Sequence, residues 1–179
     1  MRNIVIVCLI LLATLVVLPT LRAVVNSQTI NIDQPKVVYS LPYPGILTDH
    51  PLYPIKQLRD SILVFTTRDN LKKAELYHLL ADKHLAIAIR LEDKGKEQLA
   101  MNELKESQEF FSKVPKLLKE SKGQGAAATN DFITKLYLSN AKHEEIMTNF
   151  LKKVTQDNID TINKLIKKNK EIRAEIGKI

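Results

Sequence analysis

Apolar residues recur at steps of three and four through most of the chain beyond residue 52, which is the spacing of amphipathic helices. Short polar or glycine-containing stretches interrupt this pattern at 67–69, 94–96, 122–130 and 155–157. They separate five expected helices, at about 52–66, 71–93, 96–121, 131–154 and from 158 onward. Long helices joined by short loops pack as antiparallel neighbours. The predicted fold is therefore all-α: an antiparallel bundle of three long helices, with a short N-terminal helix and a C-terminal helix.

The stretch before these helices, residues 28–51, is rich in proline and tyrosine and is expected to form an extended arm. Pro42 and Pro44 fix their own φ and disfavour helix at the residues before them. Gly45 then gives a turn signal. We expect three side chains to bury themselves and hold the arm to the bundle, while two basic residues nearby stay exposed. The buried three are Tyr43, Leu52 and Tyr53, and the exposed two are Lys56 and Arg59.

The first expected helix carries one apolar stripe, which predicts that it docks across one end of the bundle. The stripe consists of Leu52, Ile55, Leu58, Ile62 and Phe65. The expected N-caps are Asp49 for the first helix, Asp69 for the second, and Thr129 or Asn130 for the fourth. Gly95 suits the position just after the second helix. Pro115 must kink or restart the third helix, because it has no N–H to donate.

The fourth expected helix has a heptad-like seam with two polar members, Asn140 and His143. The whole seam is Ile133, Leu136, Asn140, His143, Met147, Phe150 and Val154. His84 lies on the apolar stripe of the second helix, so His84 and His143 could meet in the core. One interpretation is that they are hydrogen-bonded core side chains that fix how the helices pack. The other is a metal-binding or proton-sensing pair.

The sequence carries none of the common catalytic motifs. The segment His143-Glu144-Glu145 lacks a second histidine four positions on, as a helical zinc motif requires. Adjacent acids such as Glu92 and Asp93 diverge by about 100° on a helix, so they do not form a general acid–base pair. We therefore expect no catalytic, cofactor-binding or metal-binding residues, and no enzyme.

Residues 4–21 form an uncharged apolar run that follows Arg2. Such a run is typical of a signal peptide or of an uncleaved membrane anchor, and either places residues 28–179 outside the cytoplasm. The predicted organisation is a signal or anchor at 1–27, the extended arm at 28–51 and the helical bundle at 52–179. Cys8, the one cysteine, lies inside the apolar run, so the exported part has no disulfide.

Lysine and arginine exceed aspartate and glutamate by 27 to 20, and the two signs alternate along the expected helices. This alternation is typical of solvated helix faces, and without a nucleic-acid motif it does not support binding of nucleic acid. Residues 164–179 are more strongly basic. They form either a fifth bundle helix with a solvated face, or a basic amphipathic helix that lies on an anionic surface or docks with a partner.

The Pro/Tyr stretch resembles the opening element of a bacterial family of exported domains of unknown function. That element has the form YPG-[IL]-L-x-D-x-P-L-Y-x-x-K, and the chain has YPGIL at 43–47 and DHPLYPIK at 49–56. Later segments similar to the family are KKAEL at 72–76, LADKHL at 80–85 and AKHEEI at 141–146. The resemblance spans about 37–165. It implies an all-α exported domain and no assigned activity.

Together these observations favour a non-enzymatic, extracytoplasmic helical-bundle protein of the bacterial cell envelope. It would act through contacts with an unknown protein partner, and residues 4–21 would anchor it in the membrane if they are retained. Two alternatives stay open. One is a ligand- or metal-sensing bundle with His84 and His143 inside, and the other is a chaperone-like envelope binder that uses the basic C-terminal helix.

Overall fold

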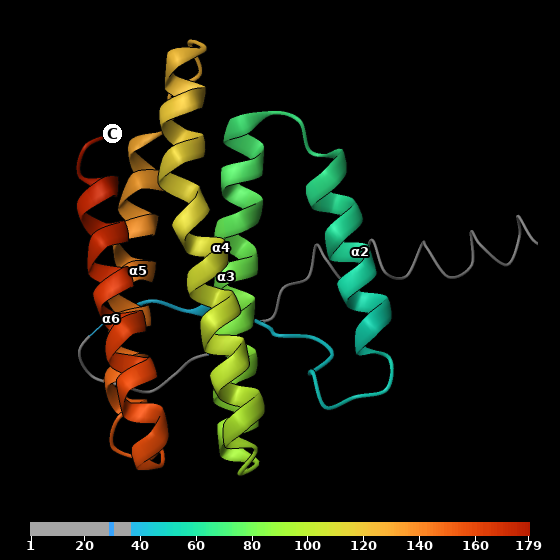
Figure 1. Ribbon diagram of the computed structural model, residues 1–179. Coiled ribbons are helices and arrows are strands. Elements are labelled where there is room, and N and C mark those ends of the chain that lie inside the picture. Colours follow the sequence, from blue (N-terminus) through green and yellow to red (C-terminus); the bar gives the residue numbers. More distant parts are fainter. Residues whose placement is uncertain (1–28, 31–36) are drawn as a thin grey trace, which may run out of the picture.

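Five helices, α2 to α6, make up most of the part of the chain that the computed structural model describes, residues 29–30 and 37–179 (Figure 1). Their bounds are Tyr53–Thr66 for α2, Asn70–Asp93 for α3, Glu97–Gly123 for α4, Asn130–Phe150 for α5 and Gln156–Ile176 for α6. The predicted all-α fold is confirmed. The predicted signal or anchor at 1–27 lies outside the described residues. Among the residues that are described, no helix is both long and apolar enough to span a membrane.

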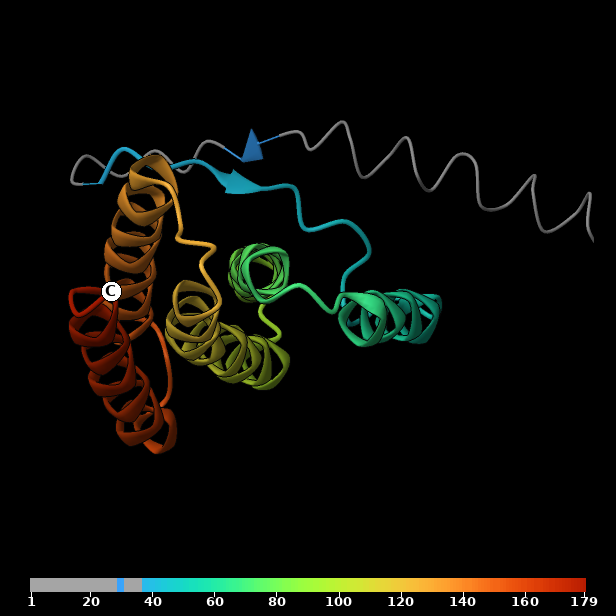
Figure 2. The same cartoon turned by 90° about the horizontal axis from the view of Figure 1, so that it is seen from above.

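The helices form two antiparallel hairpins that pack side by side, with α2 on the outside (Figure 2). α3 and α4 make one hairpin, α5 and α6 make the other, and α4 packs against α6 where the two hairpins meet. α6 is as long as α5, so the bundle has four long helices, and the C-terminal helix is a full member of it. α2 runs beside α3 and makes few backbone contacts with it.

Three of the predicted helix ends are confirmed. The Asp69 carboxylate accepts from the backbone N–H of Lys72 at 2.8 Å, and the Thr129 hydroxyl accepts from the N–H of Phe132 at 3.2 Å. Each satisfies one of the free donors at a helix start. Gly95, which follows α3, has φ +69°, the left-handed conformation that ends many helices.

Asp49 does not cap the first helix, contrary to the sequence prediction. Its carboxylate instead contacts two ammonium groups at the α3–α4 turn, Lys94 Nζ at 2.9 Å and Lys96 Nζ at 2.8 Å. The hydrogen bonds from these two lysines lower the pKa of Asp49 to about 2. The Nδ1 atom of His50 accepts from the N–H of Leu52 at the start of α2. Asp49 therefore ties the arm to the base of the bundle.

Two helices differ from the predicted lengths. α4 continues through Pro115 and does not restart there, and Pro115 itself is buried. α5 ends at Phe150, four residues before the predicted end, and turn residues connect it to α6 at Gln156. The predicted seam of α5 is otherwise confirmed, because Asn140 and His143 are fully buried beside its apolar members.

The core consists of two apolar clusters along the bundle axis. One contains Leu85, Leu91 and Met101 near the α3–α4 turn, and the other contains Phe111 and Leu136 toward the opposite end. Between them lies a layer of buried polar side chains. The bundle is therefore held by apolar burial at both ends and by hydrogen bonds in the middle.

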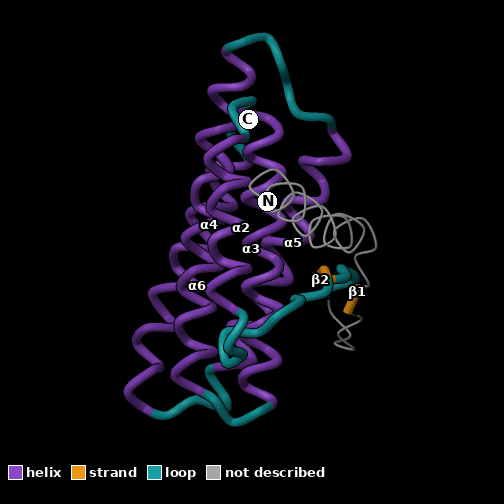
Figure 3. The backbone as a smooth tube through the Cα atoms, turned by 90° about the vertical axis from the view of Figure 1, so that its right-hand side faces the viewer, coloured by secondary structure: helices purple, strands orange, loops and turns teal. Residues whose placement is uncertain are grey.

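The arm crosses one side of the bundle before it reaches α2 (Figure 3). Its Leu41–Pro42 segment is the short strand β2, which pairs antiparallel with β1, Thr29–Ile30. Leu41 is fully buried in the first apolar cluster, and it anchors the arm. The predicted anchors differ. Tyr43 and Leu52, which were predicted to be buried, are about half exposed, and Tyr53 is partly buried.

α2 is turned the opposite way from the sequence prediction. Its apolar stripe faces outward: Ile55 is 66% exposed, Leu58 62%, Ile62 53% and Phe65 82%. Lys56, predicted to be exposed, is buried on the inner side, and Arg59 is partly buried. Amphipathic spacing predicts that a stripe is covered, but it does not say which molecule covers it.

Candidate functional site

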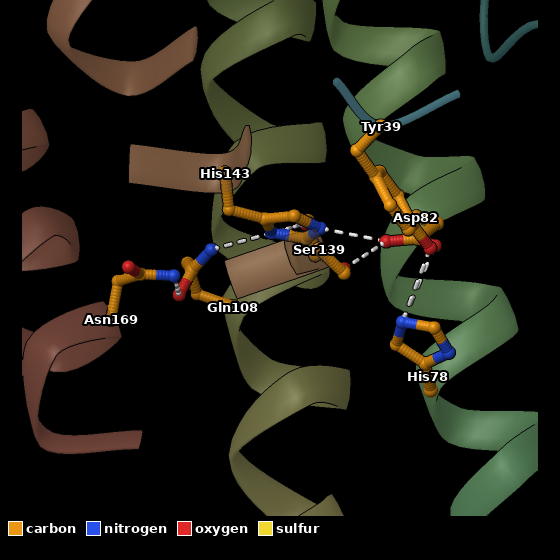
Figure 4. A network of polar contacts seen from close by, with 8 residues as sticks. Tyr39, His78, Asp82, Gln108, Ser139, His143 and Asn169 are labelled. Carbon is orange, nitrogen blue, oxygen red and sulfur yellow. Dashed lines mark hydrogen bonds and ion pairs between the residues drawn. The ribbon is translucent and has the colours of Figure 1, made fainter. Parts of the chain in front are cut away.

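A buried carboxylate, Asp82, is the centre of the polar layer (Figure 4). Its Oδ1 atom accepts from Ser139 Oγ at 2.6 Å and from His143 Nε2 at 2.9 Å. Its Oδ2 atom accepts from the Tyr39 hydroxyl at 2.5 Å and lies 3.4 Å from His78 Nε2. Both carboxylate oxygens thus have donors, which offsets the loss of water on burial. These contacts join the arm, α3 and α5 at one point.

His143 extends the network to α4 and α6. Its Nε2–H donates to Asp82, so its Nδ1 atom accepts, from Gln108 Nε2 at 3.0 Å and from Ser107 Oγ at 3.3 Å. Gln108 Oε1 in turn faces Asn169 Nδ2 of α6 at 3.5 Å. The donors and acceptors are satisfied when His143 is the neutral Nε2–H tautomer. The network therefore fixes the relative positions of all four long helices.

The same contacts set the protonation states. Burial alone would raise the pKa of the Asp82 carboxyl, but the charge that His78 can carry and the hydrogen bonds from His143 and Ser139 lower it to about 2. Burial lowers the pKa of His78, against the pull of Asp82. Burial and the Asp82 charge raise the pKa of Tyr39, so its hydroxyl stays protonated and donates. The Asp82 carboxyl is therefore ionised at neutral pH.

His84 and His143 do not meet. His143 turns toward Asp82 inside the bundle, whereas His84 lies on the other side of α3, with its Nδ1 atom 2.6 Å from Glu103 Oε2. Across the described residues, no cluster of histidine, cysteine, aspartate and glutamate has a geometry that could hold a metal ion. The interpretation of His143 and Asn140 as hydrogen-bonded core residues is confirmed, and a shared site with His84 is wrong.

A cleft of about 980 Å³ separates α2 from the α3–α4 hairpin. At one end lies Glu103, only 3% exposed, which accepts from Thr48 Oγ1, from the Tyr53 hydroxyl at 3.4 Å and from His84. Burial and the Glu103 charge raise the pKa of Tyr53 to about 12. Lys56 donates there to the backbone oxygen of Pro44 at 3.0 Å. This end of the cleft is therefore closed by hydrogen bonds within the protein.

The inner wall of the cleft is aromatic. The rings of His84 and Phe110 are stacked with centroids 5.1 Å apart, and Phe110 lies 5.7 Å from Tyr77. Lys113 Nζ lies over both Phe110 and Tyr77, 5.3 and 5.5 Å from their centroids. Arg68 and Lys73 line the same end of the cleft, away from Glu103. The cleft thus runs from a hydrogen-bonded end, along an aromatic wall, to a basic end.

The basic C-terminal helix is the fifth bundle helix rather than a detached one. Ile162, Ile172 and Ile176 of α6 are buried against the bundle. On its outer side Lys168 contacts Glu109 at 2.8 Å, and Lys119 of α4 contacts Glu175 at 2.5 Å. The interpretation as a bundle helix with a solvated face is confirmed.

Helical periodicity placed His84, His143 and Asn140 on apolar stripes, but it did not predict that the acids Asp82 and Glu103 are buried. Asp82 follows His78 by one helical turn, and the residues between them, Leu79–Ala81, form an apolar run. A charged residue in such a run is a signal for a buried polar contact. Tyr39 and Ser139, its other partners, carry no comparable signal, because they approach Asp82 only after the chain has folded.

Neither a curated protein nor a solved structure matches the chain. Residues 45–171 match the family described as Domain of unknown function (DUF5667). The matched stretch contains α2 to α5 whole, together with most of α6 and the cleft. Since it covers well over half of the chain, the protein belongs to this family of domains of unknown function.

Proposed function

We propose that the protein is a non-enzymatic, extracytoplasmic helical scaffold of the bacterial cell envelope, which acts by binding a helix of a partner protein. The outward face of α2 is the binding surface. The observation that carries this proposal is the exposed apolar stripe of α2, on a bundle whose other helices bury theirs. A contiguous apolar patch of this kind marks interaction surfaces on soluble proteins.

The spacing of the stripe favours a helix as the partner. Ile55, Leu58, Ile62 and Phe65 follow one another at steps of three, four and three, the seam of two helices that pack along their length. α2 has 14 residues and is therefore about 21 Å long, enough for two heptads of contact. Leu63, 40% exposed, lies beside this seam. The regular steps of three and four along α2 suit packing against a second helix.

The charges beside the stripe define the partner further. Arg59 lies at the edge of the stripe, and Asp60, with which it pairs at 2.6 Å, is largely buried on the inner side. Two copies of this face would bring like charges together. A partner helix with acidic residues beside its apolar seam would be complementary to it. We therefore assign the face to an acid-flanked helix of another protein.

Two synthetic helical peptides test this assignment. Both carry the same leucine and isoleucine seam, and their flanking positions hold glutamate in one and lysine in the other. We expect the glutamate peptide to bind at least tenfold more tightly by fluorescence anisotropy, less so at high salt. The double variant Leu58→Asp/Ile62→Asp should lose this binding. Lys116→Asp, a change at an exposed position of α4, should keep it.

Three outcomes would overturn the proposal. One is equal affinity for both peptides, or affinity that the double variant keeps. Another is sedimentation showing a dimer of this chain that the double variant abolishes, because the face would then bind a second copy. The third is binding to vesicles of anionic lipid with no binding of either peptide, which would make α2 a membrane-surface helix. Far-UV circular dichroism of each variant checks that the bundle is folded.

The remaining parts of the proposal rest on other observations. The uncharged run at residues 4–21 supports export, and the absence of a catalytic motif supports a non-enzymatic role. N-terminal sequencing of the protein from fractionated cells tests export. A mature N-terminus near residue 28, or a full-length chain in the membrane fraction with its bundle open to external protease, is expected. A full-length chain in the cytoplasm would contradict it.

A further inference from the structure

We propose that the cleft behind α2 binds a small planar aromatic carboxylate that carries a hydroxyl or amino group at its far end. The ring lies against Phe110 and Tyr77, the carboxylate meets the basic end, and the far group donates to His84. Phe65 of the α2 stripe also lines this cleft, but Leu58 and Ile62 do not, and the site does not depend on the proposed partner helix.

The cleft has the size and lining of a ligand site. Its volume of about 980 Å³ lies at the upper end of the range for small-molecule pockets. Tyr77, His84 and Phe110 line the inner wall, Gln57, Asp60 and Ser61 of α2 line the outer one, and charged side chains lie at both ends. That distribution fits a ligand whose ring lies against the inner wall and whose polar groups reach the two ends.

The aromatic wall selects a planar body. His84, Phe110 and Tyr77 stand in sequence along the α3–α4 hairpin, with His84 and Phe110 stacked at 23°. A flat aromatic ligand can meet such a wall in an edge-to-face arrangement, which aromatic pairs favour. His84 and Tyr77 are two turns of α3 apart, about 10 Å. The ligand therefore has the length of two fused rings rather than one.

The charges of the cleft select an anion. Among the described residues, Arg68 and Lys73 have no ion pair, and Lys113 has one long contact, 3.8 Å to Glu109. Of the acids that line the cleft, Glu103 lies at the opposite end and Asp60 pairs with Arg59. Glu106 is then the acid set against Arg68, Lys73 and Lys113. An anion entering this end meets a net positive field, and arginine can hold a carboxylate through two hydrogen bonds.

His84 sets the group at the other end. Because the Glu103 carboxylate accepts from Nδ1–H at 2.6 Å, the neutral ring keeps its proton on Nδ1 and offers the lone pair of Nε2. Within the described part of the chain, Nε2 has no hydrogen-bond partner of its own. A hydroxyl or amino group on the ligand would supply the missing donor.

The probe 6-hydroxy-2-naphthoate has the body and both ends of this ligand, and it is fluorescent. Two analogues lack one end each: 2-naphthoate lacks the hydroxyl, and 2-naphthol lacks the carboxylate. We expect saturable binding of the probe at one site per chain, weakened about threefold for 2-naphthoate and at least tenfold for 2-naphthol. Lys73→Glu should weaken the probe at least tenfold and 2-naphthol hardly at all, and Lys116→Glu should change neither.

The variant Leu58→Asp/Ile62→Asp separates this site from the outward face. It should keep full affinity for the probe even where it loses the partner peptide. Loss of probe binding in that variant would place the probe on the α2 stripe and overturn the proposal. So would the absence of saturable binding, or equal affinities for the probe and 2-naphthol. Lys73 is partly exposed and its change leaves the core intact, so a null effect of Lys73→Glu also counts against the site.

Discussion

The polar layer around Asp82 and the helix α2 differ in which side chains they bury and which they expose. In the layer, charged and polar side chains lie inside the protein, and each carboxylate oxygen of Asp82 has a donor. On α2, apolar side chains lie outside, and nothing among the described residues covers Ile55, Leu58 or Ile62. The layer joins five parts of the chain, whereas α2 contacts the bundle through few residues.

Under the proposed function, stability and binding are divided between these two regions of the molecule. The four long helices bury their apolar clusters with the arm, and hydrogen bonds join the polar layer between them, although the buried side-chain oxygens of Asn140 and Asn169 have no partner among residues 29–30 and 37–179. α2 contributes little to the stability of this four-helix bundle, and its apolar side is exposed. Regions that take part in binding are often those of low local stability. The following predictions test this division, from the largest expected effect to the smallest.

Replacing Asp82 by alanine should destabilise the protein most. The change leaves the Nε2–H of His143, the Ser139 hydroxyl and the Tyr39 hydroxyl buried without an acceptor, and breaking a buried pair in this way costs about 3–5 kcal/mol. Urea unfolding followed by circular dichroism measures it. Asp93→Ala, at an exposed position of the same helix, is the control. A loss no larger than that of the control would show that the layer does not hold the bundle.

Removing an apolar side chain should cost much more stability in the core of the four-helix bundle than on α2. Leu85→Ala opens a cavity at a fully buried site and should cost about 2–5 kcal/mol of unfolding free energy. Ile62→Ala removes a side chain that is 53% exposed and should change it by about 0.5 kcal/mol or less. Equal losses for the two variants would mean that the α2 stripe is covered in the isolated protein.

Acid should lower the free energy of unfolding of the four-helix bundle, because Asp82 becomes protonated. Its pKa is about 2 in the folded state and has an ordinary value of 3.8, so the unfolded chain binds the proton more readily. The stabilisation is present above pH 4 and is lost as pH falls toward 2, by about 2 kcal/mol. Unfolding curves at intervals across this range should show the loss in the wild type. In Asp82→Asn, a decline of the same size would rule out Asp82 as its source.

The pKa of Lys56 shows whether α2 packs beside the α3–α4 hairpin in solution. Burial lowers the pKa of its ammonium group to about 8, from an ordinary value of 10.5. With a lowered folded-state pKa, this lysine loses its proton earlier in the folded protein, and its burial penalty disappears as pH rises from 8 to 10.5. NMR of ¹³C-methylated lysines should show one resonance that titrates near pH 8 and is absent in Lys56→Arg. Titration of every lysine near pH 10.5 would mean that α2 stands away from the hairpin.

The sequence predicted the helices well, because their signals are local. Asp69, Thr129 and Gly95 act within one turn of the ends they mark, and the α5 seam from Leu136 to Phe150 follows directly from helical periodicity. The polar layer could not be predicted in the same way. Asp82 meets Tyr39 and Ser139 only because the arm and α5 pack beside α3, and those residues lie 43 and 57 positions away.

The outward turn of α2 has a different cause. An apolar stripe at helical spacing predicts that the stripe is buried, and the sequence suggested that the bundle of the same chain would cover it. In the structure the polar side of α2, with Lys56 and Asp60, lines the cleft, and Lys56 bonds the backbone oxygens of Pro44 and Ile46. Those contacts depend on where the arm ends, which no pattern in α2 encodes. The stripe then faces outward.

Hydrogen exchange with mass spectrometry, with and without the glutamate-flanked peptide, tests the central claim most directly. In the free protein, amides of α2 should exchange at least tenfold faster than those of α3, because α2 opens without unfolding the bundle. When the peptide is added, the α2 amides should slow while those of α3 stay unchanged. Protection of α2 equal to that of α3 in the free protein, or no slowing on addition of the peptide, would contradict the account.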